Sequence, residues 1–285
     1  MMQQGLVDLH RVAQDGTRVR ASAGASSFRR AETLAALMMQ AREHLDAVTR
    51  VAADPAISAR RAAARKRGAA QRLARLDAAL AQVAEVTATK QRSRAKDATV
   101  RVSTTDPDAR VMKMGDGGFR PAFNVQFATT TDAARVIVGV DVGNRGSDMG
   151  QSTLACARVA RTGVRPDEIL LDGGYAQHDA IDAAAAQDVT VFAPVPKPRN
   201  GDTRDPHVAR DGDSAAVAAW RTRMGTEDAK QIYKQRAATA ETVNADAKTH
   251  RGLDHLPVRG LGKALGSATL FALTYNILRV IALHG

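Results

Sequence analysis

The spacing of hydrophobic and polar residues changes twice along the chain. Residues 6–22 alternate apolar and polar positions around Asp15-Gly16, which predicts two strands flanking a turn. Between about residues 27 and 97 the apolar positions follow a helical period instead. Asp54-Pro55 interrupts that period, so we expect two antiparallel helices there, arranged as a hairpin.

The rest of the chain alternates short apolar runs with helical segments. We predict strands over Phe119–Thr129, Arg135–Val142, Glu168–Asp172 and 189–194, and helices over Asp148–Thr162, 177–187 and Gln231–Arg251. A β-rich opening followed by this alternation predicts an α/β fold, with a mixed sheet and helices on both faces. We divide the chain into first strands (1–26), a helical insertion (27–97) and the remaining core with a C-terminal helix (98–285).

Two later segments lack this regular alternation. Residues 195–213 are rich in Pro, Gly and charge and have no period, which predicts a long polar loop. Trp220 follows this loop, and we interpret it as a packing anchor. The apolar stretch Leu261–Leu283 is interrupted by Lys263, Asn276 and Arg279, so we expect a terminal core helix rather than a membrane span.

Net charge and cysteine content narrow the class of protein. The 285 residues carry a formal net charge of +11, which indicates a polyanionic partner. The N-terminus lacks the pattern of a signal peptide, and the single cysteine, Cys156, permits neither an intrachain disulfide nor a cysteine metal cluster. We therefore expect a soluble cytoplasmic protein.

The positive charge is concentrated in the predicted helical hairpin. Residues 57–101 carry twelve Lys and Arg against three Asp and Glu. Because no aromatic residue lies between Phe28 and Phe119, we expect contacts with phosphates rather than stacking on bases; a solvated helix face would explain the same charge. The candidate phosphate contacts are Arg60, Arg61, Arg65, Lys66 and Arg67.

Three carboxylates are candidates for chemistry. Asp15 and Asp172 lie at the ends of predicted strands, where sites collect in sheets of this class, and Glu241 lies on a predicted helix. Three acids without a His or Cys cluster suit Mg²⁺, although their spacing alone does not show that their carboxylates converge. Simpler interpretations exist, because Asp-Gly is a common turn and an aspartate directly after a buried strand is often exposed or paired.

A polar face surrounds Glu241 on the predicted helix Gln231–Arg251. At about 100° per residue, one arc of roughly 140° contains Tyr233, Arg236, Glu241, Asn244, Lys248 and Arg251. Ion pairs at helical spacing on a solvated surface would produce the same pattern.

Several short motifs occur in a fixed order along nearly the whole chain. Those that carry the acids are D-G-T-R at 15–18, L-L-D-G-G-Y at 170–175, and a tyrosine–arginine–glutamate–lysine signature made by Tyr233, Arg236, Glu241 and Lys248. The supporting matches are T-D-P-D-A-R at 105–110, F-N-V-Q at 123–126, H-R-G-L at 250–253, V-R-G-L at 258–261 and A-L-T-Y-N-I-L-R at 272–279. Together they resemble a bacterial insertion-sequence transposase of the DDE class, in the transposase DDE domain family.

The resemblance implies a fold, a reaction and roles for these residues. It implies an RNase H-like catalytic core, a mixed sheet flanked by helices, with the basic helical insertion after the first strand. Asp15, Asp172 and Glu241 would be the catalytic triad that binds two Mg²⁺ or Mn²⁺ ions. Tyr233 and Arg236, with Lys248, would contact the DNA of the transposon ends. The implied activity is metal-dependent DNA cleavage followed by strand transfer into target DNA.

Alternatives remain open beside this interpretation. Asp106 and Asp108 are rival candidates for the first acid. Relatives normally carry a helical region before the first catalytic strand, so the resemblance implies a truncated copy. A non-catalytic DNA-binding remnant, or an inhibitor of a full-length transposase, would fit the basic hairpin, and a metal-dependent nuclease would cut without joining. Assembly as a homo-oligomer is also left open.

Overall fold

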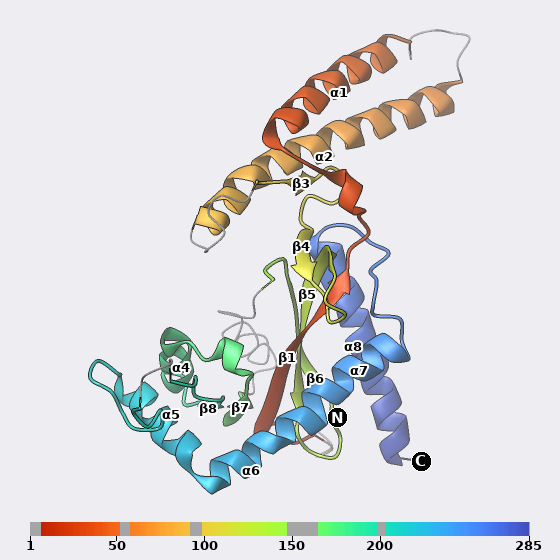
Figure 1. Ribbon diagram of the computed structural model, residues 1–285. Helices are drawn as coiled ribbons and strands as arrows, with labels where there is room; N and C mark the ends of the chain where they lie inside the picture. The colour runs from red at the N-terminus through yellow and green to blue at the C-terminus, as the bar shows by residue number, and fades with distance from the viewer. Residues whose placement is uncertain (1–6, 52–57, 92–98, 147–164, 199–202, 285) are drawn as a thin grey trace. The chain divides into compact units, whose positions relative to one another are not determined.

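A computed structural model describes residues 7–51, 58–91, 99–146, 165–198 and 203–284 (Figure 1). The chain divides into two compact units. Unit 1 consists of Met1–Val19, Asn124–His255 and Ala264–Gly285, and unit 2 of Arg20–Phe123 and Leu256–Lys263. The predicted helix Asp148–Thr162, which includes Cys156, lies outside the described residues.

A mixed sheet forms the centre of unit 1. Its strands are β1 (Arg11–Arg20), β5 (Phe119–Thr130), β6 (Ile137–Gly143), β7 (Glu168–Leu170) and β8 (Thr190–Phe192). β1 is parallel to β7 and β7 to β8, whereas β5 is antiparallel to β6. The strand order β6-β5-β1-β7-β8 places β1 at the centre. The predicted α/β class with a mixed sheet is confirmed.

The predicted turn at Asp15-Gly16 is wrong. β1 runs without a break from Arg11 to Arg20, and Asp15 lies in the middle of it. Asp-Gly favours a turn when local preference decides, but strand pairing on both sides of β1 outweighs that preference here. The candidate acid Asp15 therefore lies within the central strand of the sheet.

Helices pack against the sheet after the last strands. They are α4 (His178–Ala185), α5 (Ala215–Gly225), α6 (Glu227–Arg236), the π-helical segment η5 (Ala237–Glu241) and α7 (Thr242–Thr249). Trp220 on α5 is fully buried, and its indole Nε1–H donates to the carbonyl of Ala193 at 3.0 Å. The prediction of a packing anchor is confirmed.

The predicted polar loop is tied down within the residues described. Its last charged residue, Asp213, forms a buried ion pair with Arg221 of α5, at 2.7 Å from carboxylate to Nε. Arg221 also donates to the carbonyl of Pro206 and lies over the Trp220 ring. One buried guanidinium therefore fastens the loop to the core of unit 1.

Helix α8 (Leu261–His284) is buried along one side only. In unit 1 its Ala268, Ala272 and Tyr275 are buried, and Phe271 packs on Phe127 with ring centroids 5.4 Å apart. Asn276, an interruption in the apolar stretch, exchanges two hydrogen bonds with the backbone of Ile137. Among the described helices, this one is long and apolar enough to cross a membrane by length and composition; a single such helix is weak evidence for a membrane protein.

Unit 2 contains the predicted helical hairpin. Helices α1 (Ala31–Val51) and α2 (Ala59–Gln91) pack through a shared apolar cluster, and the short strands β2 (Phe28–Arg29) and β3 (Val102–Ser103) pair antiparallel at its base (Figure 1). Strand β4 (Arg110–Lys113) pairs with the first residues of β5. Leu34 and Leu76 have almost no exposed surface, so the hairpin has a core of its own.

Candidate active site

Asp15 is held by two side chains from the helices that follow the sheet. Its Oδ1 accepts a hydrogen bond from Nη2 of Arg236 at 2.9 Å, and its Oδ2 accepts one from Nδ2 of Asn244 at 2.9 Å. The Asp15 side chain is 20% exposed and that of Arg236 is 11% exposed. The central strand and the late helices therefore meet at a largely buried ion pair.

A π-helical turn brings Glu241 to the same arginine. Arg236 ends α6, Glu241 ends η5, and Nη1 of Arg236 lies 3.4 Å from Oε1 of Glu241. In a π turn the hydrogen bonds join residues five apart, and the wider turn brings side chains at this spacing closer to one face than an α-helix does. The single α-helix predicted over Gln231–Arg251 is wrong in this respect, because an α-helix leaves residues five apart on diverging faces.

Asp172 follows the end of β7 by two residues. Its exposed carboxylate accepts the N–H of Gly173 at 2.6 Å and caps the 3₁₀ turn η4 (Gly173–Tyr175). Its negative charge acts on both Tyr233 and Arg236. Burial alone would lower the pKa of Arg236, but the charges of Asp15, Tyr233, Asp172 and Glu241 raise it above its ordinary value. Asp15 and Glu241 thus pair with one guanidinium, and the charge of Asp172 also acts on it.

The other two residues of the signature lie beside these acids. Tyr233 shares a side-chain hydrogen bond with Arg236, and its pKa is raised, chiefly by burial. The pKa of Lys248 is lowered by burial and then by the nearby Arg18, while Asp15 opposes this shift. The site therefore combines three acids with the cations of Arg236, Lys248 and Arg18.

Two supporting features had no role predicted from the sequence. Asn244 lies on the predicted polar face, and the structure makes it the second partner of Asp15. Gln126, from the F-N-V-Q motif, accepts hydrogen bonds from the Tyr175 hydroxyl and from Nε2 of Gln14. Gln14 precedes Asp15, and Tyr175 follows Asp172 by three residues. This buried contact therefore links the segments that carry two of the acids.

The rival acids serve a different purpose in unit 2. Asp106 is buried and accepts the N–H of Gly260 at 3.1 Å, and burial is the main reason that its pKa is raised. Asp108 accepts the N–H of Leu261 at 3.0 Å, at the start of α8. Both carboxylates therefore hold the backbone of the segment at Gly260 and Leu261.

The acids are not arranged as a ready metal site. No group of three or more His, Cys, Asp or Glu residues in the described parts of the chain is placed to hold a metal ion. Carboxylate oxygens are the donors that Mg²⁺ prefers, but here Asp15 and Glu241 are both paired with Arg236. The carboxylates of Asp15 and Glu241 therefore meet at a guanidinium rather than at an arrangement ready for an ion.

The predicted basic residues lie on the surface of α2. Arg60, Arg61, Arg65, Lys66 and Arg67 are all exposed in unit 2. None of the five forms a salt bridge with another described residue. Within the described parts of unit 2, their charges therefore face solvent without a protein counter-ion.

Fold and site together describe an α/β protein in which acids from a central strand, a strand end and a late helix meet basic side chains. Residues 199–281 match the family model described as a transposase DDE domain. That segment, which contains Arg236, Glu241 and Lys248, is therefore similar to transposase DDE domains. No curated protein and no solved structure shows a match.

Proposed function

We propose that the chain acts as a DDE transposase, with DNA as its substrate. The observation that carries the proposal is that Asp15 and Glu241, from separate segments, both pair with Arg236, while the charge of Asp172 from a third segment acts on the same guanidinium. The family match covers the segment with the third acid. The strand order, with β1 between an antiparallel pair and two parallel strands, supports the RNase H-like form of the sheet.

The proposed reaction has two steps at phosphorus. Water attacks a phosphodiester at the element end, the bond to the 3′ oxygen breaks, and a free 3′-OH is left. That hydroxyl then attacks a phosphodiester of target DNA and displaces another 3′ oxygen, which joins the strands. Arg236, Lys248 and Tyr233 are proposed to contact the phosphates and hold the strand at the acids.

The proposal includes two Mg²⁺ or Mn²⁺ ions as cofactor. Transposase DDE domains generally use divalent metal ions, which can activate water and stabilise a leaving oxygen. Asp15 and Glu241 become available to such ions only when Arg236 leaves them. A DNA phosphate is the natural competitor for that guanidinium, because arginine pairs with phosphate in the same two-pronged way as with carboxylate. DNA binding is thereby proposed to prepare the acids for metal.

The test is an analysis of the products from labelled duplexes that carry the DNA bordering the gene, incubated with Mg²⁺ and with EDTA. A transposase leaves 3′-OH ends and then joined products, both dependent on Mg²⁺. Cutting without joining would instead indicate a nuclease on the same site. Binding without cutting would indicate the non-catalytic remnant or inhibitor.

A separate prediction concerns the exposed basic residues of α2. Replacing Arg60, Arg61, Arg65, Lys66 and Arg67 together by Ala is expected to weaken binding to all duplex sequences about equally. The plot of log affinity against log salt concentration should become less steep, with the magnitude of its slope reduced by about 0.9 for each phosphate that these side chains no longer neutralise. Fluorescence anisotropy over a salt series measures both. An unchanged slope would mean that these charges are only solvated, and weaker binding to one sequence alone would mean that they read bases.

A further inference from the structure

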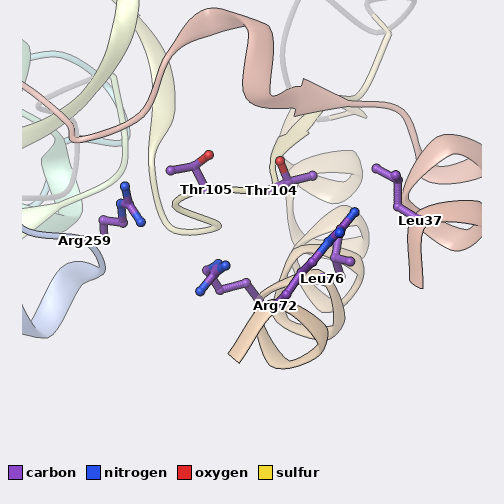
Figure 2. A pocket seen from close by; sticks show the side chains of 7 residues that line it. Leu37, Arg72, Leu76, Thr104, Thr105 and Arg259 are labelled. Carbon is purple, nitrogen blue, oxygen red and sulfur yellow. The ribbon is translucent and has the colours of Figure 1, made fainter. Parts of the chain in front are cut away.

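A cavity of about 280 Å³ lies within unit 2 (Figure 2). It is lined by Leu37, Arg72, Arg75, Leu76, Thr104, Thr105 and Arg259. Leu37 comes from α1, the arginine pair and Leu76 from α2, the threonines from the loop after β3, and Arg259 from the segment 256–263. Segments far apart in the sequence thus contribute three cations and two hydroxyls to one opening.

The charge of this cavity is largely uncompensated. In the part of unit 2 that the structure describes, neither Arg72 nor Arg75 forms a salt bridge. The Nε–H of Arg259 donates a hydrogen bond to the carbonyl of Ser22 at 3.3 Å. The guanidinium also interacts electrostatically with the neighbouring Asp106. The lining therefore presents three cations to one opening, which would attract an anion.

Two of the sequence motifs contribute to the cavity, and neither takes part in the candidate active site around Arg236. The loop of T-D-P-D-A-R starts at Thr105, and V-R-G-L contributes Arg259. Asp106 and Asp108 bind the backbone N–H groups of Gly260 and Leu261, directly after Arg259. The acids of one motif therefore fix the position of the other, and with it the arginine at the cavity.

We propose that this cavity binds one backbone phosphate of a DNA strand, an inference that rests on DNA being the substrate. Arginine and threonine donors match the oxygens of a phosphate, and the short apolar wall of Leu37 and Leu76 offers no ring for a base to stack on. Pockets for apolar small molecules are usually larger and lined mainly by apolar and aromatic side chains. The cavity gives unit 2 an anchoring point for DNA in addition to the exposed basic residues of α2.

The test compares two double variants with the same loss of charge. Arg72→Gln/Arg259→Gln removes two cations from the cavity, and Arg30→Gln/Arg42→Gln removes two exposed cations of unit 2 that lie outside its lining. Affinity for a short duplex is measured by anisotropy over a salt series with EDTA present, so cleavage does not contribute. The cavity variant is expected to bind about 10-fold more weakly at 0.1 M salt, with a slope smaller by about 0.9, and the outer variant to stay near wild type.

A third variant and a second ligand sharpen the result. Thr105→Val keeps all three charges and is expected to weaken binding about 3-fold with an unchanged slope, because it removes one donor. Thermal unfolding in the presence of inorganic phosphate tests whether the cavity binds free phosphate instead of a phosphate of DNA. The assignment to DNA would be overturned if phosphate stabilised the wild type but not Arg72→Gln/Arg259→Gln, while both proteins bound the duplex equally well. Equal effects of the two double variants on duplex binding would overturn the cavity as a phosphate site. If the wild type bound no DNA at all, DNA as the substrate would be refuted.

Discussion

Asp172→Asn is expected to reduce DNA strand cleavage by about 10³-fold or more, the scale seen when one member of a catalytic set that works as a unit is removed. The carboxylate is exposed, and within the described residues its hydrogen bond to the N–H of Gly173 can equally be accepted by an asparagine oxygen. The 3₁₀ turn after β7 should therefore persist. Cleavage under single-turnover conditions measures the loss, and anisotropy confirms that DNA is still bound.

Asp179→Asn is the matched control for this variant. Asp179 is an exposed acid in the first turn of α4, seven residues further along. Its replacement removes the same charge from the same unit and should leave the cleavage rate within about 2-fold of wild type. If both variants lost activity equally, general charge rather than a catalytic carboxylate would explain the effect.

Arg221→Met is expected to destabilise unit 1 by about 3 kcal/mol, because it leaves the buried Asp213 carboxylate without its cation. For a domain of this size that corresponds to a fall of roughly 6–12 °C in Tm. Burial opposes ionisation of Asp213, but hydrogen bonds from Arg221 and the Arg210 N–H hold its pKa below the ordinary 3.8. The pair therefore stabilises the fold above about pH 3.8, and its contribution is lost as the pH falls below that value.

Two further variants separate the ion pair from simple loss of an arginine. Arg251→Met breaks the Arg251–Asp246 pair, also 2.7 Å long but with both side chains more exposed, and should cost at most about 1 kcal/mol. Arg221→Met/Asp213→Asn removes both charges and should recover part of the lost stability. Equal destabilisation by Arg221→Met and Arg251→Met, measured by thermal unfolding at pH 7, would contradict a special role for the buried pair.

Much of the architecture could be predicted from periodicity. The helical spacing between residues 27 and 97 and the apolar runs around Ile169 and Val191 follow directly from which positions must be buried. The order of the motifs also indicated which acids and cations belong together. Asp15 was harder to place, because Asp-Gly favours a turn and only the pairing of β1 with its neighbours makes this position part of a continuous strand.

The contacts around Arg236 could not be predicted in this way. A 100° helical wheel treats Gln231–Arg251 as regular, whereas the π turn at Ala237–Glu241 changes which side chains share a face. The sequence contains no Gly or Pro there to mark the change. Asp15 lies more than two hundred residues before Arg236 in the sequence. The hydrogen bond between them depends on how the helices pack on the sheet. The cavity at Arg259 has the same origin, because its lining comes from segments that only the fold brings together.

The most direct test of the account is the single-turnover cleavage rate of Glu241→Gln in Mg²⁺, measured beside wild type and Glu227→Gln. Glu241 is 60% exposed and pairs with Arg236, so a surface ion pair and a catalytic acid predict very different results. Glu227 is also exposed, in the first turn of α6, and lies on the same stretch of helices. A catalytic role for Glu241 predicts a loss of about 10³-fold for Glu241→Gln and a rate close to wild type for Glu227→Gln. A Glu241→Gln protein that cleaves as fast as wild type would contradict it.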